Sequence, residues 1–326
     1  MHPKRGAKTI LTDLEDELGL DKNFPSVSTL TRLFRGLPET KVYEPNRPVY
    51  VQTIKADTAH DLWQIDDMGA EMYPGLGHMG LLNVKDVSSR VQTGILFKEY
   101  THCREHPDTK DYVKMLRGAF KEFGMPKSIQ SDRGSIFKEN QSKSPFPTHL
   151  HLWLVGLGIN FQHARAHKPT DQAVIERTHQ TIYNQLYRTL DYESAEELRI
   201  EGRKRMDKLN HRIPCASLGL PPLIQNPDAI HSGRTFEDEK ALYKVERVAE
   251  LLGKMEWFRK VASAKTFALG KQIYYHSNLK RGQQIKIRFN AETMNLNCYN
   301  DKELIPEVQI KGIAYEQLTA FFDTVL

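Results

Sequence analysis

Apolar residues recur at helical spacing in two stretches near the start of the chain. The first stretch ends at Gly19, and the second follows Pro25 and Ser26, a residue type that caps helix N-termini. The apolar positions are Ile10, Leu11, Leu14 and Leu18, and then Val27, Leu30, Leu33 and Leu37. Because residues at this spacing share one face of a helix, the pattern predicts two short helices.

The second predicted helix turns short hydroxyl and arginine side chains away from its apolar face. These residues are Ser28, Thr29, Thr31, Arg32 and Arg35. Such side chains suit contacts to phosphates and base edges in a major groove, so the helix pair is a candidate helix-turn-helix. A plain helical hairpin that packs on its neighbour fits the same residues.

Strand and helix patterns alternate along residues 59–212. Strands are predicted at 62–68, 81–84, 91–97, 128–131 and 159–161, and helices at 113–123, 150–157 and 173–190. A strand meander followed by alternating helices and strands predicts a mixed β-sheet flanked by helices. The expected fold class is therefore α/β, with an all-α segment before this core.

The last part of the chain has a β pattern. In residues 284–289, Ile285, Ile287 and Phe289 alternate with polar residues, and shorter strands are predicted at 267–269 and 273–275. A small β-barrel with a basic outer face would account for this pattern. The predicted organisation is a helix-turn-helix at 1–42, a linker at 43–58, the core at 59–212, an extended, initially proline-rich connector at 213–250 and the barrel at 251–326.

Composition excludes several protein classes. The 326 residues are 39% hydrophobic and 27% charged, which is ordinary for a globular protein and argues against a wholly disordered chain. No apolar run approaches the ~20 residues of a membrane span, and no signal peptide is expected. Cys103, Cys215 and Cys298 lie far apart, which disfavours a disulfide framework or a cysteine-rich zinc module and fits a reducing cytosol.

Basic residues are concentrated in one segment. The net charge is only +5, but residues 254–290 hold nine Lys and Arg residues against one acid, Glu256. Such a segment suits a polyanion, most often nucleic acid, and a solvated basic face is the alternative. Lys286 and Arg288, on the polar side of the alternating strand, are candidate DNA contacts.

Three acids stand where a carboxylate is costly without a partner. Asp66 lies inside an apolar strand, Asp132 follows the strand at 128–131, and Glu176 lies early in the helix at 173–190. If the two strands are neighbours and the helix packs across their ends, the three carboxylates converge. Like charges that close require a cation, and a pair of Mg²⁺ ions is the natural solution for phosphoryl transfer.

Each acid also has a structural interpretation. Asp132 could be a turn acid before Gly134, and Glu176 could interact with a helix dipole. Asp67 adjoins Asp66 but points to the opposite strand face, so we interpret it as a surface residue rather than a ligand.

Three motifs, in order, resemble those of the retroviral-integrase-like DDE transposases. WQID at 63–66 resembles the first catalytic strand, SDRGSIF at 131–137 the second motif, and KPTDQAVIERTH at 168–179 the third. Residues 209–222 are similar to the segment that closes the core in bacterial insertion-sequence transposases, and WFRKV at 257–261 resembles the start of their C-terminal domain. The interval between the second and third acids is longer here than is common in the family.

The resemblance implies an RNase H-like core in which Asp66, Asp132 and Glu176 hold two Mg²⁺ ions, which Mn²⁺ may replace. By analogy, water cleaves a phosphodiester at the transposon end, and the freed 3′-hydroxyl attacks target DNA. Two other functions share the fold: a DNA-binding protein that has lost catalysis, and an RNase H-type nuclease that cuts RNA. A helix-turn-helix and a basic barrel favour duplex DNA.

The resemblance also implies DNA as the partner and a homo-oligomer, a dimer or tetramer, acting on paired ends in the bacterial cytoplasm at the nucleoid, with no membrane partner. The candidate DNA-binding residues are Ser28, Arg32, Arg35, Lys168, Arg177, His179, Lys286 and Arg288. Arg177 and His179 follow Glu176 and could reach phosphates or the metal ligands. Surface solvation is the alternative for each of these side chains.

Overall fold

The chain divides into two units, Met1–Tyr50 and Val51–Leu326, in the computed structural model. The structure describes residues 25–36, 56–73, 75–103, 105–132, 146–164, 169–187, 192–269, 272–300 and 303–311. No helix in these ranges has the length and apolar character that crossing a bilayer requires.

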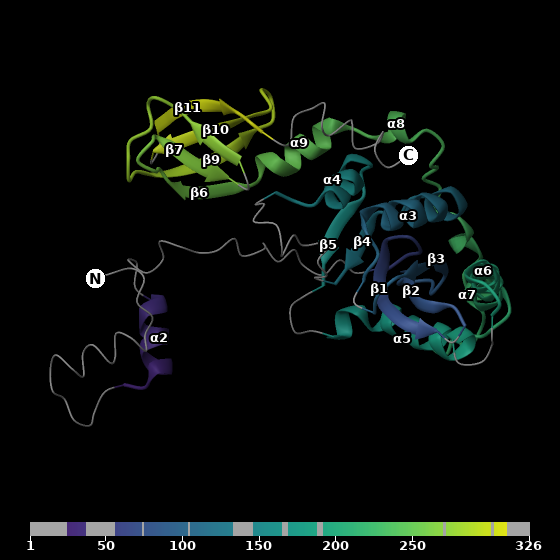
Figure 1. Cartoon of the computed structure of the whole chain (residues 1–326). Coiled ribbons are helices and arrows are strands. Elements are labelled where there is room, and N and C mark those ends of the chain that lie inside the picture. Colours follow the sequence, from purple (N-terminus) through teal and green to yellow (C-terminus); the bar gives the residue numbers. More distant parts are fainter. Residues whose placement is uncertain are drawn as a thin grey trace. The chain divides into compact units, whose positions relative to one another are not determined.

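The described part of the first unit is one helix, α2 (Val27–Gly36, Figure 1). The Ser26 hydroxyl accepts a hydrogen bond from Thr29 N at 3.3 Å, as the sequence pattern predicts for a cap. Leu30 is buried, whereas Leu33 is 57% exposed, so only part of the expected apolar stripe is covered. The first predicted helix lies outside the described residues, and the helix-turn-helix therefore stays a prediction.

A five-stranded mixed sheet forms the centre of the second unit (Figure 1). Its strands are β1 (Leu62–Tyr73), β2 (Gly77–Asp86), β3 (Gln92–Tyr100), β4 (Ser128–Ser131) and β5 (Asn160–His163). The strand order is β3-β2-β1-β4-β5. The first three strands pair antiparallel, and β4 pairs parallel to both β1 and β5. The predicted mixed α/β fold is confirmed.

Helices cover both faces of this sheet (Figure 1). They are α3 (Thr109–Phe123), α4 (His149–Gly156), the 3-10 turn η2 (Pro169–Gln172), α5 (Ala173–Ile182) and α6 (Ala195–His211). On one face, Trp63 of β1 packs against Phe120 of α3, in the same core cluster as Trp153 of α4. On the other face, Ile182 and the residues after it pack on β2 and β3.

The helix predicted at 173–190 differs in its second half. The α-helix ends at Ile182 and continues as a π-helical segment, η3 (Tyr183–Tyr187). Leu186 is fully buried within this segment, so the apolar periodicity correctly indicated the buried side. Residues 188–190 lie outside the described ranges.

The segment predicted as an extended connector packs into the core instead. It forms α7 (Pro222–Gln225), η4 (Pro227–Ile230), α8 (Glu239–Leu242) and α9 (Val245–Gly253). Leu223, Ala229 and Phe236 are buried in the same cluster as Trp63. Proline at the first position of a helix is favourable, and two of the prolines that suggested an extended connector, Pro222 and Pro227, begin helical turns here.

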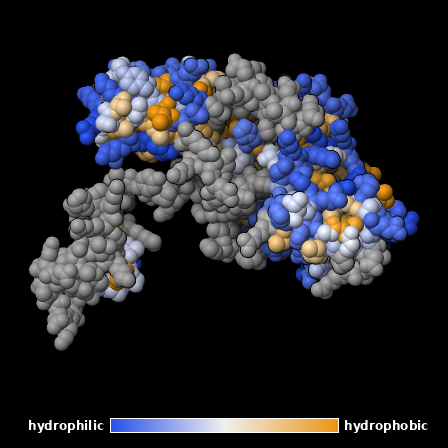
Figure 2. Space-filling view, in the orientation of Figure 1, coloured by the Kyte–Doolittle hydropathy of each residue, from blue (hydrophilic) through white to orange (hydrophobic). Residues whose placement is uncertain are grey.

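Six strands follow at the C-terminal end. They are β6 (Glu256–Lys260), β7 (Thr266–Leu269), β8 (Gln272–Tyr275), β9 (Gln284–Asn290), β10 (Asn295–Asn300) and β11 (Glu303–Gln309). Ile285, Ile287 and Phe289 of β9 are buried, as their alternation predicts. Most of the described surface over these strands is hydrophilic (Figure 2). The described ladders form a four-stranded sheet and a separate β7–β8 pair, so barrel closure stays a prediction.

Candidate functional site

The register of two parallel strands brings two of the predicted acids side by side. Ile65 of β1 pairs with Ser131 of β4. Asp66 and Asp132 each follow their paired residue by one position. Since neighbouring parallel strands lie about 4.8 Å apart, the two acids lie at adjacent points, where β4 ends beside the middle of β1.

Asp66 is a partly buried carboxyl surrounded by other acids. Its side chain is 18% exposed. Burial, together with the nearby carboxyls of Asp132, Asp67 and Glu176, raises the pKa of Asp66 to about 8. Like charges raise a pKa appreciably only at short range, so the carboxyls predicted from the motifs share one electrostatic environment.

His179 adjoins this group from α5. Its Nδ1 lies 3.6 Å from Asp66 Oδ2, and its side chain is 12% exposed. Burial lowers the pKa of His179 to about 4, so the imidazole is neutral at pH 7. Its Nε2 is buried and has no hydrogen-bond partner among the described residues.

Glu176 reaches the site from the first turn of α5, where its side chain is exposed. Gln64 of β1 holds the start of this helix against the sheet. Its Oε1 accepts a hydrogen bond from Ile175 N at 3.3 Å, and its Nε2 donates to the carbonyl oxygen of Asp171 at 2.5 Å. The position of Glu176 relative to β1 therefore depends on one buried glutamine.

Gln64 belongs to a polar row that crosses the whole sheet. Strand pairing aligns Gln162, Gln130, Gln64, Lys85 and Gln92, one residue from each strand. Paired residues point to the same side of a sheet, so the row lies on the face that carries Asp66. The sequence carries a signal for it that motif reasoning missed: both Asp66 and Asp132 stand two positions after a glutamine.

The backbone at Asp132 is held by two side chains. Its carbonyl oxygen accepts a hydrogen bond from Ser131 Oγ at 2.8 Å and lies 3.0 Å from His163 Nδ1. His163 ends β5, and its ring packs edge-on against Phe161 at a centroid distance of 5.2 Å. His163 was not among the residues that the sequence singled out, because only strand pairing brings it to Asp132.

Asp67 is not the surface residue that we inferred from strand alternation. It does point to the opposite face, but that face is covered by α3. Its carboxylate accepts a hydrogen bond from Tyr112 Oη at 2.8 Å and contacts His106 Nδ1 at 2.8 Å. Burial and the nearby Asp67 raise the pKa of Tyr112 well above its usual value. Asp67 is therefore a structural partner of α3.

A divalent metal suits the chemistry of these donors. Carboxylate oxygens are the ligands that Mg²⁺ and Mn²⁺ prefer, and the raised pKa of Asp66 reflects negative charge that a cation would neutralise. Within the ranges that the structure describes, no three His, Cys, Asp or Glu side chains are arranged to hold a metal ion.

Of the candidate DNA contacts on and near the helices, some are exposed side chains and others lie outside the described residues. Ser28 and Arg32 are exposed on α2, and Arg177 is exposed on α5. The side chain of Arg35 and the whole of Lys168 lie outside the described residues.

The two candidate contacts on β9 share one acid. Lys286 Nζ lies 3.7 Å from Glu256 Oε1, and Arg288 Nε donates to the same oxygen at 2.6 Å. The Arg288 guanidinium also lies 6.0 Å from the ring centroid of Tyr299. Glu256 therefore offsets part of the positive charge on this strand.

No family model matches the chain. It is similar to the HTLV-2 integrase catalytic core domain in complex with magnesium, in trimeric form, at 16% identity and a TM-score of 0.37, covering 51% of this chain and 95% of that one. The chain also matches a simian T-cell lymphotropic virus intasome in complex with PP2A regulatory subunit B56 gamma, at 13% identity and a TM-score of 0.40. This match covers 95% of this chain and 100% of that one. The catalytic core domain of BIV integrase matches at 14% identity and a TM-score of 0.35, and the match covers 52% of this chain and 95% of that one.

Proposed function

We propose that this chain is a DDE-type transposase or integrase with an RNase H-like core, which cleaves transposon DNA ends and joins them to target DNA. The observation that carries the proposal is the β1–β4 register, which brings Asp66 and Asp132 to adjacent points, while Gln64 ties the first turn of α5, which bears Glu176, to β1. The raised pKa of Asp66 supports the convergence of the three carboxyls. A group of acids where β4 ends beside β1, next to a neutral histidine, suits metal-assisted phosphoryl transfer.

Asp66, Asp132 and Glu176 would hold two Mg²⁺ ions, or Mn²⁺ in their place. When bound, such ions activate an attacking oxygen and stabilise the leaving oxygen of a phosphodiester. The protein's own residues supply the positioning. Gln64 orients the first turn of α5, and hence Glu176, while Ser131 and His163 hold the backbone at Asp132.

The proposed partner is DNA, bound by a homo-oligomer on paired ends. His179 Nδ1 lies 3.6 Å from Asp66 Oδ2, and Arg177 follows Glu176 on α5 with an exposed side chain. Arg32 is exposed on α2, where a phosphate or base edge could be contacted. The other proposed DNA contacts are Ser28 and Arg35 of α2 and Lys168, which precedes α5 in the sequence. On β9 they are Lys286 and Arg288.

A strand-transfer assay tests the proposal. The full chain is incubated with Mg²⁺ or Mn²⁺, a duplex carrying the terminal sequence of its own element, and a target plasmid. Asp66→Asn should reduce the joined product by about 100- to 1,000-fold, because each tenfold is about 1.4 kcal/mol and the metal supplies several kcal/mol.

Asp67→Asn is the matched control, because Asp67 is the next residue of the same strand and faces α3. It should keep activity within about tenfold of the unchanged protein. Strand transfer that survives Asp66→Asn would refute the role of Asp66. Specific end binding without joined products would favour a non-catalytic DNA-binding protein, and preferred cleavage of RNA in hybrids would favour a nuclease.

A further inference from the structure

A cavity of about 450 Å³ lies between α5, the end of α6 and the turn that follows β2. From α5 it is lined by Val174, Arg177, Thr178 and Thr181, whereas Glu176 and His179 are not among its lining residues. The cavity is therefore distinct from the acid cluster, although the same helix borders both.

Among the residues that the structure describes, the cavity lining includes three cations and no acid. Lys85 comes from β2, Arg90 from the following turn and Arg177 from α5. Burial lowers the pKa of Lys85 to about 8, against an opposing attraction to Cys215 and with a smaller contribution from Arg90. Lys85 is the largely buried member of this group, and a buried positive charge is costly unless an anion accompanies it.

The nearest acid in sequence does not neutralise this charge. Asp86 directly follows Lys85, but its carboxylate is committed elsewhere. Its Oδ1 accepts from His60 N at 3.0 Å, and its Oδ2 accepts from Ser89 N at 2.8 Å and from Ser89 Oγ at 2.5 Å. Within the described part of the chain, none of the three cations that line the cavity has an ion-pair partner at 4.0 Å or less.

The walls of the cavity are held by hydrogen bonds. Asn210 of α6 bonds both backbone groups of Gln92, accepting from its N at 2.8 Å and donating to its carbonyl oxygen at 2.9 Å. The opposite wall is a tight turn in which Cys215 N donates to Leu220 O at 3.0 Å and Leu218 N donates to Cys215 O at 2.9 Å. The parts of the cavity wall that β3, α6 and the turn at 215–220 form are therefore fixed by these bonds.

We propose that this cavity binds a phosphate group through Lys85, Arg90 and Arg177. A phosphate brings the negative charge that the cavity lacks and several acceptor oxygens, and arginine guanidinium groups bind it in a fork. The cavity is larger than one phosphate, so the group can be a free anion with water or part of a DNA backbone. This binding does not depend on catalysis by the acid cluster.

Cys215 provides a reporter inside the cavity. Burial opposes ionisation of its thiol, but the Ser217 hydroxyl and the charges of Lys85 and Arg90 together lower its pKa. A thiol with a lowered pKa is more reactive toward alkylation. An anion bound between the cations would both shield this sulfur and weaken their effect on it.

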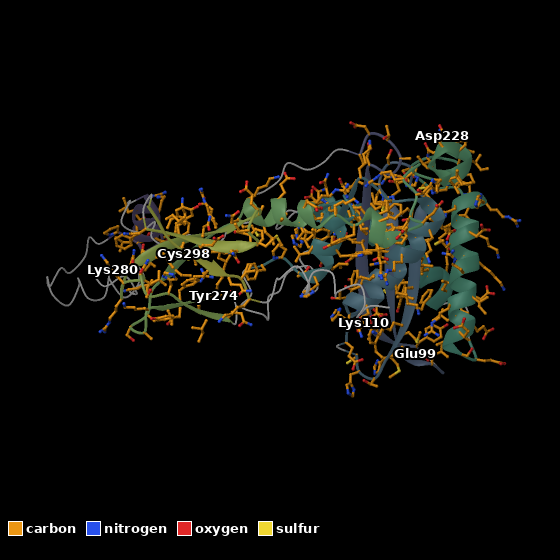
Figure 3. The ribbon with its side chains drawn as sticks, turned by 90° about the horizontal axis from the view of Figure 1, so that it is seen from above. Glu99, Lys110, Asp228, Tyr274, Lys280 and Cys298 are labelled. Carbon is orange, nitrogen blue, oxygen red and sulfur yellow. The ribbon has the colours of Figure 1, made fainter. Side chains whose placement is uncertain are left out.

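The test measures alkylation of the full chain by iodoacetamide, followed at each cysteine by mass spectrometry. Sodium phosphate is compared with sodium chloride at equal ionic strength. Phosphate should slow modification of Cys215 at least fivefold. Cys103, which is exposed, should react at an unchanged rate, and Cys298, which is buried in the C-terminal strands (Figure 3), should stay unreactive.

Two variants and a second ligand sharpen the result. Lys85→Met and Arg90→Gln should each abolish the protection, while Lys110→Gln, at an exposed lysine on α3 (Figure 3), should retain it. Thermal unfolding confirms that each variant folds, and Arg90→Gln carries the test if Lys85→Met does not fold.

The source of the phosphate is separated by repeating the assay with a duplex oligonucleotide in chloride. Protection by duplex alone assigns the site to the DNA backbone, and protection by inorganic phosphate assigns it to a free anion. The proposal is overturned if neither ligand slows Cys215, if Cys103 slows equally, or if the cavity variants keep the protection.

Discussion

Gln64 Nε2 donates a hydrogen bond to Gln130 Oε1 at 2.9 Å, across two parallel strands and two positions before the acids Asp66 and Asp132. The same amide group also donates to the backbone of η2 at Asp171. A buried amide that uses both donor hydrogens and its acceptor in this way fixes three elements relative to one another. The geometry of the acid cluster therefore depends on a residue that carries no charge.

Removing this amide should destabilise the site. Gln64→Leu removes the hydrogen-bond partner of Gln130 Oε1 and of Ile175 N, and each unsatisfied buried group costs about 1–3 kcal/mol. We expect the free energy of unfolding in urea to fall by about 2–4 kcal/mol. Amide hydrogen exchange in the first turn of α5 should also become faster.

Gln162→Leu is the matched control for this change. Gln162 stands in the same polar row, but its buried Nε2 has no partner among the described residues. Its replacement should change the free energy of unfolding by less than about 1 kcal/mol, or stabilise the protein, because no hydrogen bond from Nε2 is lost. Equal losses for the two variants would contradict the positioning role of Gln64.

Two helix glycines should respond oppositely to alanine. A Cβ at Gly202 of α6 would overlap the ring of Phe97, whereas a Cβ at Gly118 of α3 meets nothing within 4 Å. Gly118→Ala should stabilise the protein by about 0.8–1.0 kcal/mol through helix propensity. Gly202→Ala should destabilise it by about 1–2 kcal/mol, because overpacking exceeds the same gain. The free energies of unfolding of both variants in urea test this prediction. Stabilisation by Gly202→Ala would show that α6 packs less tightly on β3 than the contact between Gly202 and Phe97 indicates.

The packing of α8 against α3 and α4 can be tested at Glu239. Its carboxylate accepts from Arg117 Nε at 2.7 Å and from Trp153 Nε1 at 2.8 Å, and both members of the ion pair are 16% exposed. Glu239→Gln should lower the free energy of unfolding by about 3 kcal/mol, because it removes the carboxylate charge from a largely buried ion pair.

The control for Glu239 is an exposed ion pair on the neighbouring helix. Glu250 and Lys254 of this pair are each 70% exposed. Glu250→Gln should change the free energy of unfolding by less than about 0.5 kcal/mol. If both glutamine variants behave alike in urea at pH 7, α8 is not held to the core by this contact.

His151 should make stability depend on pH. Its ring packs on Phe161 at a centroid distance of 4.9 Å, and burial together with the nearby His163 lowers its pKa from 6.5 to about 4. Between these values the unfolded chain binds more protons than the folded one. The free energy of unfolding should therefore fall as the pH drops from 6.5 to 4, by at most about 3 kcal/mol.

Urea unfolding at several pH values checks this expectation. His151→Gln should make the profile less steep between pH 4 and 6.5, with the part that comes from His179 remaining, while His211→Gln, at a residue whose side chain is 46% exposed, should leave it unchanged. A profile that is the same in all three proteins would show that His151 titrates normally.

Hydrophobic patterning alone located the regular elements well. The strand predicted at 128–131 coincides with β4, and the alternation at 284–289 identified which side of β9 is buried. The alternation at 62–68 likewise fits the burial of Trp63 and Ile65, which are both 0% exposed. These predictions succeed because periodicity is a local property: it depends on residues that are near one another in the chain.

Local patterns failed where burial comes from distant residues. The prolines between 213 and 232 indicated an open connector, but Leu223 and Ala229 lie in the core. The alternation of β1 correctly placed Asp67 on the face opposite Asp66, yet it did not show that Tyr112 covers that face. Both the burial of the connector residues and the Tyr112–Asp67 hydrogen bond join residues far apart in the chain, so local sequence patterns do not predict them.

The sequence by itself determined the α/β class, the positions of most strands and helices, and three acids that needed an explanation. Only the tertiary structure decided that β1 pairs parallel to β4 in the register of Ile65 with Ser131, and that Gln64 ties both to α5. A parallel pair joins segments far apart in the chain, and its register is set by how the whole sheet packs. The proximity of Asp66 to Asp132 is therefore a property of the fold.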